Sequence, residues 1–255
     1  MTYNTSISYK TIFSQKAHFY KHARPSYPAP VFEYLANLLK PGSKIVEFGC
    51  GTGIFTKDLL KYDYEIYAVD PCAEMLAECK VELNNNNKVT FIESSAEDVI
   101  LKKGSIDAFV FPQSLHWMDI EKIKEIIANA ANYNSQIITV WNSRDDSDTS
   151  CSKEYNQIIH NYKKRHPLSI HVETDSYILL NRLYGEGNYK IFKCRHTHQL
   201  TQQGVEYLFL STSDIDLNAF ELSAKQELNS WFNEYQVNGY APIRYECFMS
   251  VSRNQ

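Results

Sequence analysis

Short apolar segments alternate with amphipathic segments between residues 44 and 141. The predicted strands are rich in Ile, Val and Phe and cover 44–48, 65–70, 88–93, 105–111 and 135–141. Strands that are apolar on both faces are typical of a parallel sheet covered by helices on both sides. The predicted helices that connect them cover 54–62, 73–83 and 120–131. The alternation therefore predicts an α/β fold with a doubly wound, Rossmann-like sheet.

The pattern changes on either side of this region. Helical periodicity is predicted for 12–23, 31–40, most of 152–184, 202–211 and 217–235, and strands for 190–200 and 245–253. The proline-spaced RPSYPAP at 24–30 ends the first of these helices. Counting the two later strands, the sheet is expected to have seven. We expect an N-terminal helical cap (1–40), a core formed by 41–142 and 188–255, and a mostly helical insertion (143–187).

Composition excludes several classes of protein. The net charge of −4 provides no strongly basic surface for nucleic acid or an anionic membrane, and no apolar run approaches the roughly 20 residues of a membrane helix. The first residues lack the layout of a signal peptide. Six scattered cysteines form no CxxC pair, so no zinc site is indicated. We expect a cytoplasmic protein that acts on a small molecule, without nucleic acid or membrane as partner.

The segment 45–55, IVEFGCGTGIF, places three glycines at alternate positions between a predicted strand and a predicted helix. Ligands of open α/β sheets bind at the carboxyl ends of the strands, so this loop is the expected site. A phosphate loop requires GxxxxGK followed by Ser or Thr, and a dinucleotide fingerprint requires GxGxxG. The sequence has neither, since its spacing is GxGxG. The loop therefore suits a ligand without phosphate, and a turn that binds nothing is the alternative.

EFGCGTG resembles the first motif of class I S-adenosylmethionine-dependent methyltransferases. This resemblance implies that S-adenosylmethionine is the cofactor and that Glu47 accepts a hydrogen bond from its ammonium group, directly or through water. The second strand ends in VDP (69–71), so Asp70 is the expected acceptor for both ribose hydroxyls; a helix cap is the alternative. The loop residues placed against the cofactor are Gly49, Cys50, Gly51 and Gly53.

Two further motifs follow in the order that this family has. The AEML run (73–76) after VDP places Met75 against the adenine ring by resemblance. The segment SSAEDV (94–99) is similar to the GxAED segment of the family. It implies that the Ala96 backbone and the Glu97 side chain face the adenine edge, and a solvated turn acid is the alternative for Glu97.

The resemblance extends to the type-11 methyltransferase family, close to trans-aconitate methyltransferase-like small-molecule enzymes. The segments that carry it are FSQKAHFYKHARPSYP (13–28), QSLHWMD (113–119), WNSRD (141–145) and STSDI (211–215). It implies an antiparallel last strand and an N-terminal cap that folds over the cofactor, with Tyr20 and Arg24 near the methionine carboxylate. The alternative is that Arg24 caps a helix and Tyr20 only packs. The insertion 143–187 is expected to face the substrate.

The residues after the fourth strand are candidates for the chemistry. His116 is the most plausible base, because an imidazole titrates near neutral pH; a substrate contact without proton transfer is the equal alternative. Gln113 is expected at the cofactor and Trp117 at the wall of the substrate pocket. A carboxylate acceptor needs no base, since it is ionised at pH 7, but it needs a cation, which Arg144, Arg182 or Arg244 could supply.

The leading hypothesis is an enzyme, an S-adenosylmethionine-dependent methyltransferase that O-methylates a carboxylic acid or a hydroxyl. An N-methyltransferase of an amine in a natural product or peptide is the runner-up, and a cofactor-binding module without turnover is the alternative from another class. His196 and His198 share one face of a predicted strand, but no third ligand is evident, so no metal is expected. A monomer or homodimer is expected.

Overall fold

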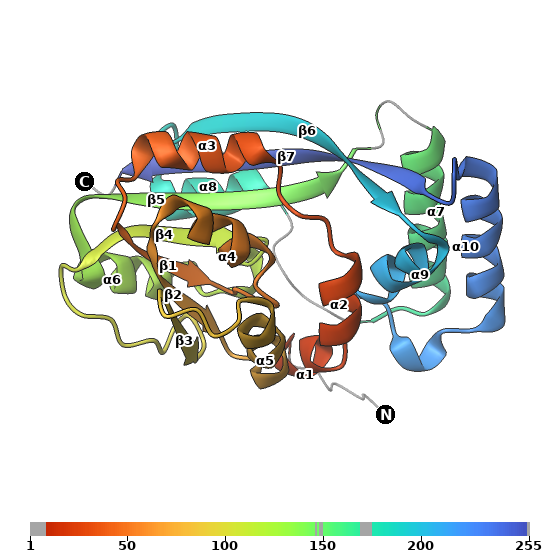
Figure 1. The fold of residues 1–255 in the computed structure, drawn as a ribbon, viewed down its shortest axis with the longest axis horizontal. Coiled ribbons are helices and arrows are strands. Elements are labelled where there is room, and N and C mark those ends of the chain that lie inside the picture. Colours follow the sequence, from red (N-terminus) through yellow and green to blue (C-terminus); the bar gives the residue numbers. More distant parts are fainter. Residues whose placement is uncertain (1–8, 146, 148–149, 169–174, 254–255) are drawn as a thin grey trace. The chain divides into compact units, whose positions relative to one another are not determined.

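The computed structural model describes residues 9–145, 147, 150–168 and 175–253 (Figure 1). The chain forms two compact units, each assembled from separated segments. Unit 1 comprises Met1–Ser26, Ser143–His171 and Arg195–Glu246, and unit 2 comprises Tyr27–Asn142, Val172–Cys194 and Cys247–Gln255. These segments do not coincide with the expected cap, core and insertion. The roles expected for 1–40 and 143–187 remain predictions.

One seven-stranded sheet has the order β3-β2-β1-β4-β5-β7-β6. Its strands are β1 (Lys44–Phe48), β2 (Glu65–Asp70), β3 (Val89–Glu93), β4 (Ile106–Pro112), β5 (Ala131–Arg144), β6 (Lys190–Leu200) and β7 (Ala241–Arg253). The first five are parallel, and Ile45 of β1 pairs with Ile66 on one side and Ala108 on the other. The arrow of β7 runs opposite to those of β5 and β6 (Figure 1). The expected Rossmann-like fold with an antiparallel last strand is confirmed.

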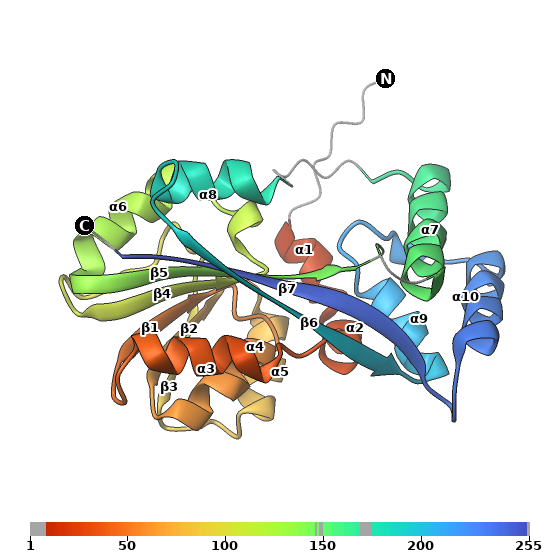
Figure 2. The same cartoon turned by 90° about the horizontal axis from the view of Figure 1, so that it is seen from above.

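Helices cover both faces of the sheet in unit 2. They are α3 (Ala29–Leu38), α4 (Ile54–Leu59), α5 (Ala73–Glu82), α6 (Ile120–Ala130) and α8 (Ser176–Tyr184). Figure 2 shows α3, α4 and α5 on one face and α6 and α8 on the other. Successive strand residues point to opposite faces. Accordingly, Ile45 packs with the first group of helices and Val46 with the second, and both side chains are fully buried.

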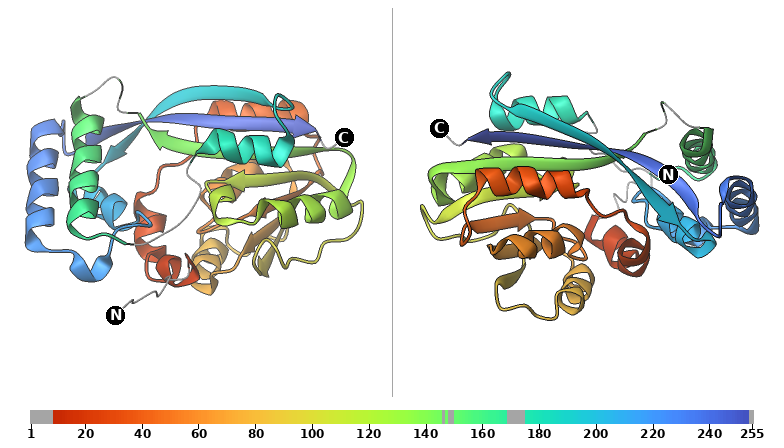
Figure 3. Two further views of the ribbon diagram at one scale, coloured as in Figure 1. Left: turned by 180° about the vertical axis from the view of Figure 1, so that it is seen from behind. Right: turned by 45° about the horizontal axis from the view of Figure 1, so that its top comes forward.

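Unit 1 is built around helices. They are α1 (Tyr9–Ser14), α2 (Ala17–Ala23), α7 (Ser150–Arg165), α9 (Gln202–Leu210) and α10 (Leu222–Tyr235). Helices α7 and α10 run side by side (Figures 1 and 3), and Tyr155 and Trp231 pack between them with ring centroids 5.1 Å apart. The core also contains Ile243 and Tyr245 from the first half of β7.

The single helix predicted over 12–23 is two helices, because the chain turns at Gln15 and Lys16. The Lys16 side chain is buried and its ammonium group donates to the carbonyl oxygens of Thr212, Ser213 and Ile215 at 2.5, 3.1 and 2.6 Å. Burying an amine requires such acceptors, and periodicity alone does not reveal them. The predicted strands 135–141 and 245–253 are also longer in the structure. None of the helices formed by the described residues is long and apolar enough to span a membrane.

Candidate active site at the carboxyl ends of the parallel strands

The glycine loop follows β1, where the strand order reverses between β1 and β4. The N–H groups of Gly49 and Cys50 both donate to the Val69 carbonyl of β2, at 2.8 and 3.1 Å. The Gly51 N–H donates to Asp70 Oδ2 at 2.9 Å. Backbone hydrogen bonds therefore fix the loop against the end of the neighbouring strand, at the position where α/β sheets bind ligands.

Two glycines of the loop are required for different reasons. Both have positive φ, 69° at Gly49 and 56° at Gly51, which side chains other than glycine rarely adopt. A Cβ at Gly49 would lie 2.5 Å from Cβ of Ser114, so the segment that follows β4 approaches too closely for any side chain. A Cβ at Gly51 would meet no described atom within 4 Å. Gly49 therefore serves packing, and the Gly51 position leaves room for a ligand.

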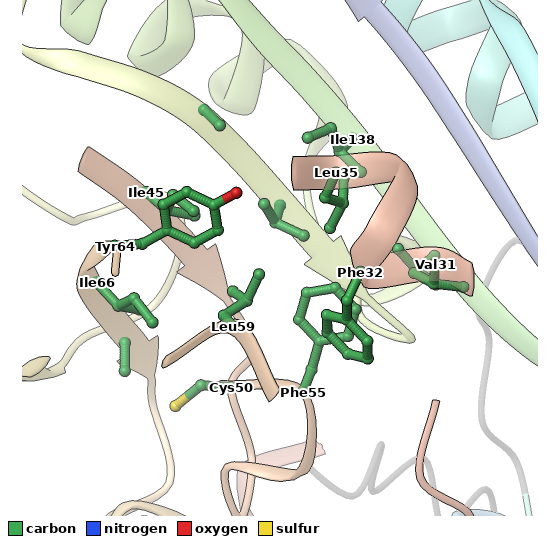
Figure 4. Close-up of a cluster of buried hydrophobic side chains, with 14 of the residues drawn as sticks. Val31, Phe32, Leu35, Ile45, Cys50, Phe55, Leu59, Tyr64, Ile66 and Ile138 are labelled. Carbon is green, nitrogen blue, oxygen red and sulfur yellow. The ribbon is translucent and has the colours of Figure 1, made fainter. Parts of the chain in front are cut away.

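The Cys50 side chain belongs to the hydrophobic core beneath the loop, beside Phe55 and Leu59 (Figure 4). The Cys79 thiol of α5 and burial raise the pKa of the Cys50 thiol well above its ordinary value. Gly53 precedes α4, and a Cβ there would lie 2.8 Å from Cys79 Sγ. Cys50 can thus contribute only its backbone to a ligand.

Glu47 is a fully buried carboxylic acid near the end of β1. Burial raises its pKa to about 8, and the charge of Asp70 adds to the rise, whereas the nearby Thr56 hydroxyl opposes it. Neither carboxyl oxygen makes a hydrogen bond of normal geometry, nor do the buried hydroxyls of Thr52 and Thr56. A buried polar group without a well-formed hydrogen bond costs free energy, so an additional donor at this site would stabilise Glu47.

Asp70 has the opposite arrangement, because both of its oxygens already accept a backbone N–H. Oδ2 accepts from Gly51 and Oδ1 from Cys72, each at 2.9 Å. Burial raises the pKa of Asp70 to about 6 although both bonds lower it. Each carboxylate oxygen can accept more than one hydrogen bond, so the expected ribose role remains compatible with this position.

The residues expected at the adenine lie next to Asp70. Ser94 N–H donates to the Asp70 carbonyl at 3.2 Å, which joins the 94–99 segment to the end of β2. Met75 and Ala96 are buried. Glu97 Oε1 accepts from the Asp119 N–H at 2.8 Å, just before α6. The side chain of Glu97 therefore connects two loops of the site, and its adenine contact stays a prediction.

The residues after β4 form the other side of the loop. Gln113 has a φ of 53°, and its side-chain amide donates to the Asn142 carbonyl at 2.7 Å. Ser114 Oγ donates to the Phe48 carbonyl at 2.6 Å, directly beneath Gly49. From the sequence, Ser114 was expected only at the mouth of the site, within the QSLHWMD motif, and its contact with β1 was not predicted. This serine joins the segment after β4 to the end of β1, where the glycine loop begins.

His116 lies in a 3-10 turn (Leu115–Trp117), and its ring is 5.1 Å from that of Trp117. Burial lowers the pKa of His116 to about 4. The imidazole is therefore neutral at pH 7 and can accept a hydrogen bond or a proton. A base with so low a pKa takes protons weakly, however, which reduces its value in general-base catalysis.

Three predicted site residues, Tyr20, Arg24 and Arg144, belong to unit 1. Arg24 lies over the Tyr20 ring, 4.8 Å from its centroid, and its Nη2 donates to the Ser211 carbonyl at 2.6 Å. Arg144 lies over the ring of Tyr155 at 5.9 Å, and its Nε donates to Asn156 Oδ1 at 2.6 Å. The contact of these residues with cofactor or substrate remains a prediction.

The two histidines on one face of β6 pack against a tyrosine. The His196 ring is stacked on Tyr245 with centroids 5.5 Å apart, and His198 Nε2 lies 3.0 Å from the Ala23 carbonyl. Burial lowers the pKa of both histidines. In the part of the chain that the structure describes, no three His, Cys, Asp or Glu residues are grouped so that they could hold a metal ion.

Comparison with known proteins agrees with this geometry. Residues 45–134 match the family described as "Methyltransferase domain". An uncharacterized methyltransferase of Mycobacterium tuberculosis is 30% identical over 127 residues, which are 50% of this chain and 50% of that protein. The chain thus spans about half the length of the first curated relatives it matches.

Two solved structures share the fold. A protein of Anaeromyxobacter dehalogenans assigned to the type II methyltransferases has a TM-score of 0.68 at 16% identity, covering 90% of this chain and 97% of that one. Phosphoethanolamine N-methyltransferase 2 of Haemonchus contortus, in complex with S-adenosylhomocysteine, has a TM-score of 0.56 at 13% identity, covering 98% and 61%. At such low sequence identity, these two comparisons show a shared fold and nothing further.

Proposed function

We propose that this chain, whose residues 45–134 match the family described as "Methyltransferase domain", is a class I enzyme that uses S-adenosylmethionine to methylate a small molecule. The proposed reaction is O-methylation of a carboxylic acid or a hydroxyl group. Support comes from the matching domain, from the Rossmann-like sheet, and from the polar groups at the end of β1 and β2.

The observation that carries the proposal is the unpaired carboxyl group of Glu47. It lies at the end of β1, one loop away from the open position beside Gly51 and close enough to Asp70 for their charges to interact. An ammonium group would supply the missing donors and would favour the ionised carboxylate. The chemistry of these residues fits a ligand that carries an ammonium group and hydroxyls but no phosphate.

When bound, the cofactor supplies a methyl group that its sulfonium has already activated. The protein has to hold the acceptor in line and exclude water. In the proposed arrangement Glu47 binds the ammonium group, Asp70 accepts from the ribose hydroxyls, and Met75 with Ala96 packs against the adenine. Tyr20 and Arg24 are proposed near the methionine carboxylate, Gln113 beside the cofactor, and Trp117 at the wall of the acceptor site.

The role of His116 depends on the acceptor. A hydroxyl acceptor must lose a proton, and His116 is the group after β4 that could take it. A carboxylate acceptor is ionised at pH 7 and needs no base. Since burial lowers the pKa of His116 to about 4, we favour a carboxylate acceptor and a contact role for His116.

An N-methyltransferase is the second candidate within the enzyme class, and the Haemonchus contortus relative in fold is an enzyme of that kind. An amine acceptor would need a carboxylate or an aromatic cage near the sulfonium. A binding module without turnover is the candidate from another class.

We also propose that the protein is cytoplasmic and that it is a monomer or a homodimer.

Titration calorimetry with S-adenosylmethionine and S-adenosylhomocysteine tests the cofactor assignment. We expect both to bind and ATP and NAD not to bind. Methyl transfer is then measured over matched sets of carboxylic acids, phenols and primary amines with a labelled methyl donor. Absence of heat with either cofactor form would refute the cofactor. Binding without transfer to any set would favour the binding module.

A further inference from the structure

Two histidines lie on one exposed face of helix α2. His18 and His22 are four residues apart in the segment HFYKH, so their side chains are neighbours one helical turn apart. The centroids of their rings are 4.7 Å apart, and both side chains are exposed. Two histidines at this spacing on a helix can bind the same zinc ion, because both imidazoles point to one side.

A tyrosine of the neighbouring helix α9 flanks the pair. The centroid of the Tyr207 ring lies 5.4 Å from that of His18 and 6.4 Å from that of His22. Phe19 packs against the same ring at 5.3 Å, and the Tyr207 hydroxyl accepts from Gln203 Nε2 at 2.9 Å. These contacts restrict the orientations of the two imidazoles, which reduces the entropy that they lose when they bind an ion.

Hydrogen bonds within unit 1 hold α2 at both of its ends. Lys16, just before the helix, is buried and donates to the Thr212 carbonyl at 2.5 Å. Arg24, just after the helix, donates to the Ser211 carbonyl at 2.6 Å. Both carbonyls come directly after the end of α9. The helix that carries the two histidines is therefore fixed to the helix that carries Tyr207 (Figure 1).

The two imidazoles have ring nitrogens that can bind a metal ion. Among the described residues, none forms a hydrogen bond or an ion pair with either imidazole. These residues also provide no third His, Cys, Asp or Glu that would complete a metal site with the pair. Two protein ligands leave the other coordination positions to water, so the ion would be held more weakly than in a closed site with four protein ligands.

We propose that His18 and His22 together bind a divalent transition-metal ion of the Zn²⁺ and Ni²⁺ type at the surface of unit 1. Imidazole nitrogen suits these ions, whereas Mg²⁺ and Ca²⁺ require oxygen ligands. Each neutral imidazole donates one nitrogen lone pair to the ion. The inference goes beyond the proposed function and is independent of it, because it involves neither the glycine loop nor methyl transfer.

Calorimetric titration of Zn²⁺ alone into the full chain at pH 7 tests the proposal. We expect Zn²⁺ and Ni²⁺ to bind and Mg²⁺ and Ca²⁺ not to bind. Bound Zn²⁺ should raise the midpoint of thermal unfolding, and EDTA should reverse the rise. His18→Ala and His22→Ala should each weaken Zn²⁺ binding by about tenfold or more, because one imidazole alone cannot chelate the ion. His160→Ala, at an exposed position of α7, should change nothing.

Further variants separate this site from other groups that bind zinc. The half-buried thiol of Cys194 is removed by Cys194→Ser, and the second histidine pair by His196→Ala combined with His198→Ala. We expect neither change to weaken Zn²⁺ binding. A loss of binding in these variants, equal affinity of His18→Ala and the unchanged protein, or no binding of Zn²⁺ and Ni²⁺ would overturn the proposal. The unfolding midpoint of each variant without metal verifies that it folds.

Discussion

The carboxylate of Asp70 accepts a hydrogen bond from the Gly51 N–H at 2.9 Å. One side chain thus fixes the glycine loop and stands at the expected ribose position. Because the buried Asp70 carboxylate accepts from two backbone N–H groups, the shape of the loop depends on the charge of Asp70. The loop and the ribose site cannot be altered independently.

Asp70→Ala should therefore weaken binding of S-adenosylhomocysteine by on the order of 1–3 kcal/mol, because a buried acceptor is lost. The orphaned Gly51 and Cys72 N–H groups should also lower the midpoint of thermal unfolding. Calorimetry and thermal unfolding measure the two effects. Glu33→Gln, at an exposed position of α3, serves as the control. Unchanged affinity in Asp70→Ala would remove this residue from the ribose role.

Substitutions at Gly49 and Gly51 are expected to have different effects, on packing at Gly49 and on ligand binding at Gly51. Gly49→Ala should prevent stable folding, since the new Cβ would meet Ser114 at 2.5 Å. Gly51→Ala should fold with a loss of about 1 kcal/mol from the positive φ, and should bind S-adenosylhomocysteine at least tenfold more weakly. Gly42→Ala, which also has positive φ and no close neighbour, is the matched control for strain alone. Equal affinities of the Gly51 and Gly42 variants would show that the open position does not face the cofactor.

Glu47 should make the stability of the ligand-free chain depend on pH. Its pKa is about 8 when folded and 4.5 at its ordinary value, so between these limits the folded state binds more protons than the unfolded state. Its contribution to stability is therefore full below pH 4.5 and is lost as the pH rises to 8. Glu47→Gln should flatten this decline in the free energy of unfolding, measured by urea denaturation from pH 5 to 8.5. An equal slope in both proteins would contradict the assignment.

The raised pKa of Glu47 also predicts that a proton is released when the cofactor binds. An ammonium partner favours the ionised carboxylate, so binding at pH 7 should release roughly one proton from Glu47. Calorimetry of S-adenosylhomocysteine in buffers of different ionisation enthalpy measures the number of protons. The release should vanish in Glu47→Gln, together with a loss of affinity. A release that persists in the variant would have to come from another group.

His116→Asn should raise the Michaelis constant of the acceptor while changing kcat by less than about tenfold, as expected of a contact. The pKa of about 4 also predicts no titration of His116 in the rate profile between pH 6 and 8. A fall in kcat of about a hundredfold, with a profile that follows a group in this range, would instead make His116 a general base. Lys122→Gln, at an exposed position of α6, provides the control.

The sequence determined most of the elements of this protein. Apolar strands such as 44–48 and 65–70 are local features, and the parallel sheet with helices on both sides follows from their alternation. The glycines of 45–55 and the acid at Asp70 are local features too, and they predict a site at the strand ends. Local pattern could not predict the break at Lys16, because its amine is stabilised by carbonyls almost 200 residues away.

Only the tertiary structure decided the environment of each polar group. Sequence identified Glu47 as an acid at a strand end, but its burial without a hydrogen-bond partner depends on the helices packed around it. The cysteine of the loop was expected at the cofactor, and packing directs its thiol into the core. Arg24 and Ser211 lie in distant segments of the chain, and folding of unit 1 brings the Arg24 guanidinium within 2.6 Å of the Ser211 carbonyl. Desolvation and proximity are properties of the packed chain, and therefore no local motif specifies them.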